Sequence, residues 1–408
     1  MPVPLEGYAL IKLEVRKNAY YDSVTLMIIS KDVKKLPGVT EALVGMGTDL
    51  NREIAANIGL AGEGFDAVTA NDFFVAASCE SEDAFSAVVA KVDELLNKKA
   101  DKRKTDYFPP TLEGALKLES GLNMAVISVP GKYAYEVARS CLEHEINVML
   151  FSDNVTMEEE KDLKEFAASR ELLVMGPDCG TAIVNNTPLA FANVVKSGDI
   201  GMVCASGTGA QEVSCIIDQL GCGISQLLGT GGRDLKQEIG GIMMRLGLDA
   251  LIHDPKTKVI TLVSKPPAPE IAAKILDQAA AGGKPTVVCF IGGEASEIER
   301  RGLYAAVSLE DAAHKAAALA RDETPEDFTG FAMGQLKAEE LAAAEAAKMA
   351  PGQKYVRGLY TGGTLCDEAM KLMIASLGHI YSNIPLKPED RLADARGGES
   401  REHTFLDL

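Results

Sequence analysis

Hydrophobic residues recur along this chain in short runs that alternate with helical patterns. Between 198 and 320 the runs are nearly continuous, and they fall at 200–204, 224–228, 259–263 and 286–291. Apolar runs of this length are typical of parallel strands that are buried on both faces of a sheet. Shorter runs separated by helical patterns occupy residues 123–195. We therefore predict an α/β fold with doubly wound parallel-sheet domains, which bind ligands beyond the carboxyl ends of their strands.

The two ends of the chain carry weaker patterns. An amphipathic helical pattern over Glu82–Leu96 and three β-rich runs predict a small α/β unit, with strands expected at 8–15, 24–30 and 73–78. The basic run at 98–104 is interpreted as a solvated linker rather than a binding patch. The segment from Lys354 onward holds one strand-loop-helix pattern, so we expect it to pack on a neighbouring domain or to be completed by another polypeptide.

A chain of 408 residues is too long for one ordinary core. We expect a small N-terminal α/β domain, two doubly wound domains, a helical linker and a C-terminal α/β segment, with bounds at 1–104, 118–196, 197–321, 322–350 and 351–408.

Composition and charge exclude several classes of function. The formal net charge of -18 argues against a nucleic-acid partner, because phosphates would be repelled. The N-terminus lacks a signal-peptide pattern and no run of about eighteen apolar residues occurs, so we predict a cytoplasmic protein without a membrane partner. The eight cysteines show no zinc-ligand spacing and the five histidines are scattered. We predict neither a metal site nor a Ser-His-Asp arrangement.

The loop after the run at 200–204 reads ASGTG and is followed by a helical pattern. Backbone amides and the helix dipole at such a turn favour an anion, which predicts a phosphate cradle at Ser206, Gly207, Thr208 and Gly209. The alternative is a serine cap with glycines required only by a tight turn. The same design recurs near the end of the chain, at Thr361, Gly362, Gly363 and Thr364.

Two further loops follow predicted strands on the same edge of the sheet. In LGTGGRD, at 228–234, Gly231 and Gly232 suit a ligand loop, and Arg233 could grip a phosphate or carboxylate or could pair with Asp234. Lys265, held by two prolines, is either a second anion contact or a solvated turn lysine. Candidate catalytic residues are thus Ser206, Thr208, Arg233 and Lys265.

A fifth loop, GPDCG at 176–180, suggests a cysteine nucleophile, but no histidine lies nearby in the sequence to act as its base. We favour a structural or cofactor-contacting turn, with Gly176, Pro177, Asp178 and Cys179 as candidate contacts.

Five ordered motifs between about Asn123 and Arg321 make the chain similar to the succinyl-CoA synthetase alpha subunit; they read VISVPGKYAYEV, VMGPDCGTAIV, GMVCASGTGAQE, LLGTGGRD and KPTVVCFIGG. Within that superfamily the stretch Met46-Gly47-Thr48 and the motif VRGLYTGGTLCDEAM resemble the FdrA family. The resemblance implies a CoA-binding domain of Rossmann type at 118–196, a flavodoxin-like ligase domain at 197–321, and a phosphate held between two helix N-termini.

The chain departs from the synthetase where the phosphorylated histidine would lie. After the run ending at Ile291 it reads GGEASEIERRGLYAAVSLEDAA, and no histidine occurs before His314. The glutamate that orients that histidine also has no match, since its counterpart lies at Ser264-Lys265. A phosphohistidine relay is therefore not expected here.

The FdrA resemblance implies a subunit of a carbamoyltransferase that converts oxalurate and phosphate to oxamate and carbamoyl phosphate in allantoin breakdown. Its expected ligands are phosphate or carbamoyl phosphate and a small anionic substrate, with coenzyme A as a further ligand that the superfamily implies. We expect partner subunits encoded nearby, or a homo-oligomer. The alternatives are a nucleoside-diphosphate-forming acid-CoA ligase subunit, which the missing histidine opposes, and a non-catalytic scaffold that binds CoA or a metabolite.

Overall fold

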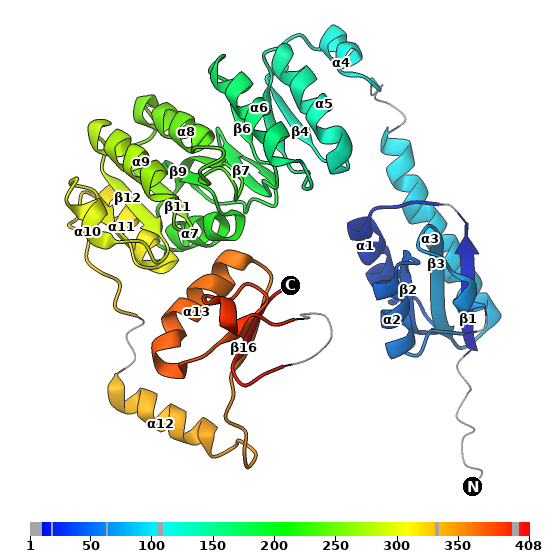
Figure 1. Cartoon of the computed structure of the whole chain (residues 1–408). Helices are drawn as coiled ribbons and strands as arrows, with labels where there is room; N and C mark the ends of the chain where they lie inside the picture. The colour runs from blue at the N-terminus through cyan, green and yellow to red at the C-terminus, as the bar shows by residue number, and fades with distance from the viewer. Residues whose placement is uncertain (1–9, 18, 63, 104–108, 331–333, 394–399) are drawn as a thin grey trace. The chain divides into compact units, whose positions relative to one another are not determined.

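The structure, a computed structural model, describes residues 10–17, 19–62, 64–103, 109–330, 334–393 and 400–408. The chain divides into two compact units, Met1–Ala115 and Leu116–Leu408. Figure 1 labels the elements of both units. Each unit has cores of its own and is described by itself.

The first unit is a three-stranded antiparallel sheet with helices on both faces; its elements are β1 (Leu10–Arg16), α1 (Ser23–Val33), β2 (Val39–Met46), α2 (Asp49–Asn57), β3 (Phe73–Cys79) and α3 (Glu82–Arg103). The strand order is β1-β3-β2, so β3 is central. Val75 and Ala77 of β3 belong to the core with α1 and α3, whereas Phe74 and Ala76 belong to the core with α2. This α/β unit agrees with the sequence pattern.

Two predictions for this unit are wrong. Residues 24–30 form part of helix α1 rather than a strand, because Asp22 caps the helix by accepting a hydrogen bond from Thr25 N at 2.9 Å. Its buried residues Leu26, Ile29 and Val33 then recur at helical spacing. The basic run is also not a linker: α3 continues through it to Arg103, since neither proline nor glycine interrupts the sequence there. Lys104 lies outside the described residues.

The second unit begins with a three-stranded parallel sheet of order β4-β5-β6. Its elements follow α4 (Leu112–Leu118) and are β4 (Met124–Ile127), α5 (Gly131–Glu143), β5 (Asn147–Leu150), α6 (Met157–Ala168) and β6 (Val174–Met175). These strands are formed by shorter apolar runs within the predicted 123–195 pattern. We refer to this sheet with α5 and α6 as the small lobe.

A seven-stranded sheet forms the centre of the second unit. Its strands are β7 (Thr181–Val184), β8 (Thr187–Ala190), β9 (Ser197–Cys204), β10 (Ile224–Gly229), β11 (Val259–Ser264), β12 (Thr286–Phe290) and β13 (Tyr304–Ala305), in the order β13-β12-β11-β9-β10-β7-β8. The four predicted strands are confirmed and run parallel to one another. The antiparallel hairpin β7–β8 and the short strand β13 were not predicted.

Helices cover both faces of this sheet, as its apolar runs predict. Met202 and Val287 pack with α7 (Gly207–Gln219) and α11 (Leu309–Ala320), whereas the adjacent Val203 and Val288 pack with α8 (Ile242–His253) and α9 (Pro269–Ala281). The short α10 (Ala295–Glu299) lies between β12 and β13 in the chain. The predicted doubly wound parallel architecture is confirmed, with an added antiparallel edge.

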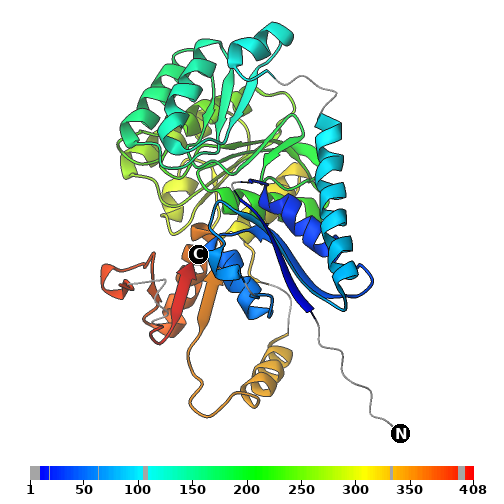
Figure 2. The same cartoon turned by 90° about the vertical axis from the view of Figure 1, so that its right-hand side faces the viewer.

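The last segment forms a smaller parallel sheet, whose order is β14-β16-β15. Its elements are α12 (Gln335–Ala346), β14 (Arg357–Tyr360), α13 (Gly363–Leu377), β15 (Tyr381–Ser382) and β16 (Thr404–Asp407). Figure 2 shows β14 in orange beside β16 in red. Cys366, Met370, Ile380 and Phe405 form a core of their own. Lys371 of α13 donates a hydrogen bond to Ile291 O at 2.7 Å, which attaches this segment to the end of β12.

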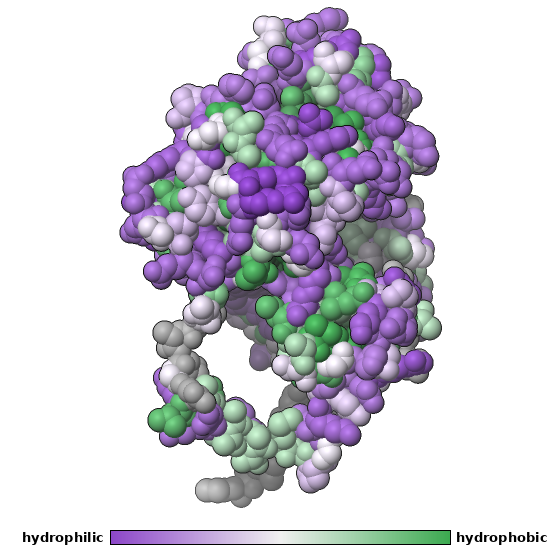
Figure 3. All heavy atoms as spheres, turned by 60° about the vertical axis from the view of Figure 1, so that its left-hand side comes forward, coloured by the Kyte–Doolittle hydropathy of each residue, from purple (hydrophilic) through white to green (hydrophobic). Residues whose placement is uncertain are grey.

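Hydrophilic residues predominate on the face drawn in Figure 3. Among the described residues, no helix combines the length and apolarity that crossing a membrane requires.

Candidate functional site

A cavity of about 1230 Å³ opens in the second unit at the carboxyl ends of parallel strands. Phe151 follows β5, Ala205 follows β9, Lys265 follows β11 and Thr361 follows β14, and all four residues line it. Three sheets therefore contribute to one cavity, at the strand ends where the sequence pattern placed the ligand.

The N-terminus of α7 forms one wall of the cavity. Ser206 is its N-cap, and its Oγ accepts a hydrogen bond from Gly209 N at 3.0 Å. The amides of Gly207 and Thr208 belong to the first turn, where a helix offers no intrahelical acceptor. The capping interpretation is thus correct for Ser206, and it leaves the first amides directed at the cavity. All four residues of the predicted cradle lie at this helix end, and all but Gly209 line the cavity.

The N-terminus of α13 meets that of α7, as the two adjacent helices in Figure 1 illustrate. Ser206 Oγ and Thr364 Oγ1 share a hydrogen bond of 2.7 Å, although the two residues are 158 positions apart. A Cβ at Gly362 would lie 2.7 Å from Thr208 Oγ1, so only glycine permits this approach. Gly362 provides no side-chain cap for α13. The structure therefore brings the two predicted cradles together into one site.

Lys265 supplies positive charge at this junction. A Cβ at Gly363 would lie 3.4 Å from Lys265 Nζ and 2.9 Å from Asp407 Oδ2, which places both side chains at the start of α13. Lys265 is exposed, and it forms no ion pair with any residue that the structure describes. The ammonium group and the two helix N-termini favour an anion of phosphate size, and the Asp407 carboxylate opposes part of this effect.

The other end of the cavity is acidic and aromatic. Asp153 and Asp178 line it together with Phe151 and Phe191, whose ring centroids lie 5.2 Å apart. Partial burial, followed by the Asp153 charge, raises the pKa of Asp178 above its usual range. Carboxylates accept hydrogen bonds, so this end suits the N–H or O–H groups of a ligand rather than its anionic part.

The glycine-rich loop at 228–234 has a different role from the predicted one. Gly231 has φ +81°, and a Cβ there would collide with the Pro177 carbonyl oxygen, so this glycine serves close packing of two loops. Gly232 lines the cavity, whereas Gly231 and Arg233 do not.

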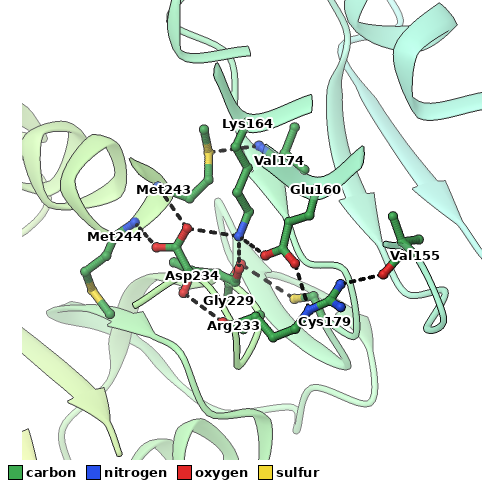
Figure 4. Close-up of polar contacts among 12 residues, drawn as sticks. Val155, Glu160, Lys164, Val174, Cys179, Gly229, Arg233, Asp234, Met243 and Met244 are labelled. Carbon is green, nitrogen blue, oxygen red and sulfur yellow. Dashed lines mark hydrogen bonds and ion pairs between the residues drawn. The ribbon is translucent and has the colours of Figure 1, made fainter. Parts of the chain in front are cut away.

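Arg233 is engaged in an ion pair and does not reach the predicted anion site. Its Nε lies 2.8 Å from Glu160 Oε2, and its Nη2 donates to Val155 O at 2.8 Å (Figure 4). Its predicted role as a direct grip on the substrate is therefore wrong in this structure. The alternative pairing with Asp234 is also wrong, because Asp234 binds Lys164.

Lys164 lies at the centre of the cluster in Figure 4 and is fully buried with Glu160 and Asp234. Its Nζ contacts Glu160 Oε1 at 2.7 Å, Asp234 Oδ1 at 2.9 Å and Thr230 O at 2.9 Å. Asp234 also accepts a hydrogen bond from Met244 N at 2.8 Å. This cluster joins the small lobe to the loop at 228–234 and to α8, and no motif in the sequence marks its lysine.

The GPDCG loop contributes Asp178 and Gly180 to the cavity, whereas Gly176, Pro177 and Cys179 are buried behind it. The Cys179 thiol contacts Thr181 O and Gly229 O, each at 3.6 Å. Burial raises the pKa of Cys179 to about 11, which opposes a thiolate nucleophile. The loop is thus a structural turn that presents Asp178, and the three buried residues are not ligand contacts here.

Thr181, Asp153 and Asp407 also line the cavity and were not predicted. Thr181 begins the antiparallel strand β7, and Asp153 lies in the loop after β5. Asp407 ends β16, so the rule that ligands bind at the carboxyl ends of strands could have identified it. Thr181 begins a strand that the sequence analysis missed.

The first unit matches the family described as "AllF, heavy metal-associated domain" over residues 9–109, and the family described as "CoA binding domain" matches residues 195–292. The second match falls on the seven-stranded sheet, whereas the resemblance to the synthetase implied CoA binding at 118–196.

Among curated proteins, the chain is 43% identical to YahF of Escherichia coli K12 over 398 residues, which are 98% of this chain and 76% of YahF. It is 25% identical over 197 residues to the succinate-CoA ligase (ADP-forming) alpha subunit of Methanothermobacter thermautotrophicus, covering 47% of this chain and 64% of that subunit. Among solved structures, ATP citrate lyase of Methanothrix soehngenii with citrate and coenzyme A is 17% identical, with a TM-score of 0.43 over 64% of this chain and 51% of that one.

The residues of the first unit do not fit a soft-metal site of the kind that the first match names. Residues 9–109 contain one cysteine, Cys79, and no histidine. Cys79 is fully buried, and this burial raises its thiol pKa, whereas a metal ligand must be a thiolate. We therefore assign no metal chemistry to this unit.

Proposed function

This chain belongs to the family of FdrA-like proteins, within the succinyl-CoA synthetase alpha-subunit superfamily, and on this premise we propose that it is a carbamoyltransferase subunit. In this proposal, free phosphate or carbamoyl phosphate binds where α7 and α13 meet. The substrate is a small anionic amide such as oxalurate, and the products are oxamate and carbamoyl phosphate.

One observation carries the proposal: two helix N-termini meet at one point through the 2.7 Å hydrogen bond between Ser206 and Thr364. A single helix end often binds only water or a cap, but two ends that converge beside Lys265 concentrate amide donors and positive charge. A tetrahedral oxyanion with several charged oxygens uses such an arrangement fully, because each oxygen accepts from a separate donor.

The histidines support a free phosphate rather than a phosphorylated side chain. All five are among the described residues, and none lines the cavity. His314 lies in α11, where its ring stacks on Phe328 with centroids 4.7 Å apart. A phosphoryl group at the junction of α7 and α13 would therefore arrive as phosphate or as carbamoyl phosphate.

The reaction needs no side-chain nucleophile. An oxygen of hydrogen phosphate attacks the carbamoyl carbon of oxalurate, and a tetrahedral oxyanion forms. The bond from this carbon to the amide nitrogen then breaks, the proton of the phosphate moves to the leaving nitrogen, and oxamate and carbamoyl phosphate result. Amides of the two helix ends would offset the charge of the phosphate, and Lys265 would stabilise the developing oxyanion. Asp153 and Asp178 would accept the N–H groups of the substrate.

A second candidate function, an acyl-CoA ligase subunit, is favoured by the size of the cavity. Its volume of about 1230 Å³ exceeds the space that phosphate and oxalurate occupy together, and ordinary small-molecule sites measure roughly 300–1,000 Å³. The remaining space, between Ser128 and the aromatic pair Phe151 and Phe191, could accept part of coenzyme A.

Assay of carbamoyl phosphate formation tests the proposal. The full chain, alone and co-expressed with the products of neighbouring genes as proposed partner subunits, is incubated with oxalurate and phosphate, and the products are followed by phosphorus NMR. We expect turnover that falls strongly in Lys265→Met and persists in Lys274→Met, an exposed lysine of α9 outside the cavity. Phosphohistidine formed on this chain from a labelled nucleoside triphosphate would instead establish the ligase.

A further inference from the structure

Thr181 carries a hydroxyl group that the protein itself leaves without a partner. It is the first residue of β7, it lines the cavity and it is only 2% exposed. Its Oγ1 has no hydrogen-bond partner among the described residues. A buried hydroxyl without a partner is unfavourable and uncommon in native proteins, so it requires an explanation, and at a cavity wall a ligand can supply the missing partner.

The Thr181 hydroxyl faces the N-terminus of α7. A Cβ at Gly207 would lie 3.9 Å from Thr181 Oγ1 and would meet no other atom within 4 Å. Gly207 is helical, with a φ outside the left-handed region, so the backbone alone does not require glycine here. The missing side chain leaves space between the Thr181 hydroxyl and the first turn of the helix.

The buried hydroxyls of Ser206 and Thr364 at this junction already have partners. Ser206 Oγ caps Gly209 N and is hydrogen-bonded to Thr364 Oγ1. Their mutual hydrogen bond uses one of the two hydroxyl protons, so one proton of this pair remains. Thr181 differs because its buried hydroxyl has no partner at all among the residues that the structure describes.

We infer that Thr181 is a further binding residue, whose hydroxyl donates a hydrogen bond to an oxygen of the phosphate or carbamoyl phosphate held at α7. This inference rests on the proposed function, because it assigns a ligand to the same anion site. It adds a donor from the β7–β8 hairpin, and the anion is then held from the seven-stranded sheet as well as from two helix ends.

Thr261 provides a matched control within the same sheet. It lies in β11, is fully buried, and its Oγ1 also has no partner among the described residues. Unlike Thr181, it is not among the residues that line the cavity. Replacing either threonine by valine removes a hydroxyl while keeping the shape of the side chain. The two variants therefore differ only in whether the lost hydroxyl lay at the cavity.

The experiment measures inorganic phosphate binding by calorimetry, at constant ionic strength, for the full chain and three variants. We expect Thr181→Val to weaken binding about tenfold, the loss of one hydrogen bond to a charged ligand. Thr181→Ser should bind within about twofold of the unaltered chain, and Thr261→Val should bind as the unaltered chain does. The melting temperature of unliganded Thr181→Val should be unchanged or higher, because the variant no longer buries an unpaired hydroxyl.

The outcomes separate this inference from the proposed function. If the unaltered chain binds phosphate and Thr181→Val binds it equally well, the assignment of Thr181 is wrong and the anion site remains. If Thr181→Val melts lower and Thr261→Val weakens binding equally, the hydroxyl acts through folding, and the assignment is again wrong. If the unaltered chain binds neither phosphate nor carbamoyl phosphate, the proposed anion site is wrong, and the assignment of Thr181 is wrong as well.

Discussion

Two glycine-rich loops of this chain look alike in sequence and differ in what their glycines do. The loop at 205–209 borders the cavity, and a Cβ at Gly207 would meet only the Thr181 hydroxyl. In the loop at 228–234, a Cβ at Gly229 would lie 2.5 Å from Cys179 Sγ, and one at Gly231 would collide with the Pro177 carbonyl oxygen. Gly207 of the first loop thus leaves space for a ligand, whereas Gly229 and Gly231 of the second loop allow two parts of the protein to pack closely.

The charged residues differ in the same way. Arg233 of the second loop is held by Glu160 beside the buried Lys164, so its guanidinium is committed to structure. Lys265 stands at the start of α13 without an ion pair among the described residues, so its charge is available to a ligand. The cation where α7 and α13 meet is thus available to a ligand, whereas the cation of the second loop is committed to an ion pair. The following changes test this difference.

The largest effect is expected from removing the cation that anchors the second loop. Lys164→Met removes the cation that the buried carboxylates of Asp234 and Glu160 share. Glu160 then keeps only its ion pair with Arg233. Breaking a buried ion pair in this way destabilises a protein by about 3–5 kcal/mol. The free energy of unfolding in urea measures the effect.

Lys161→Met is the matched control on the same helix. Lys161 pairs with Glu165 at 3.9 Å, and both side chains are about half exposed. An exposed pair contributes about 0.2–1 kcal/mol, so this variant should remain close to the unaltered chain. Equal losses in the two variants would show that the buried cluster does not anchor the loop.

Alanine at one glycine of each loop compares the two loops directly. Gly231→Ala introduces a side chain at φ +81° and against Pro177, and we expect a loss of about 2–3 kcal/mol of stability. Gly207→Ala should change stability by less than about 0.5 kcal/mol, because its Cβ meets open space and alanine favours the helix. It should nevertheless weaken phosphate binding, since the methyl group enters the site. Denaturant unfolding and calorimetry measure the two quantities, and a reversed pattern would assign the ligand to the second loop.

A negative charge in the cradle should prevent anion binding without unfolding the chain. Thr208→Glu places a carboxylate beside Gly362, where α7 and α13 meet. Repulsion at this distance should weaken phosphate binding by about 2 kcal/mol, roughly 30-fold. Thr208→Gln has nearly the same shape and no charge, so it controls for crowding. Similar calorimetric affinities for the Glu and Gln variants would mean that the helix end is only a cap.

The sequence predicted the strands of the large sheet well, because parallel strands buried on both faces are continuous apolar runs. It missed the β7–β8 hairpin, although Asn185 and Asn186, both with positive φ, are the residues that a tight hairpin turn prefers. It also treated both glycine loops alike. The atoms that distinguish Gly207 from Gly231 belong to Thr181 and Pro177, which are remote in sequence, so periodicity and local propensity carry no information about them.

The smallest predicted effect concerns Cys179, which packs against the second loop through Gly229 O. Its pKa is about 11 in the folded chain against 9.0 as the ordinary value. Between these two pH values the unfolded chain loses the thiol proton while the folded chain keeps it, so stability falls as pH rises. One pKa unit corresponds to about 1.4 kcal/mol. At pH 10 the raised pKa of Cys179 should therefore lower the free energy of unfolding by about 1–2 kcal/mol. Urea unfolding of Cys179→Ala should show a correspondingly smaller loss between pH 8.5 and 10, and its phosphate binding at pH 7 should be unchanged. Loss of phosphate binding in this variant would show that Cys179 contributes to the ligand site.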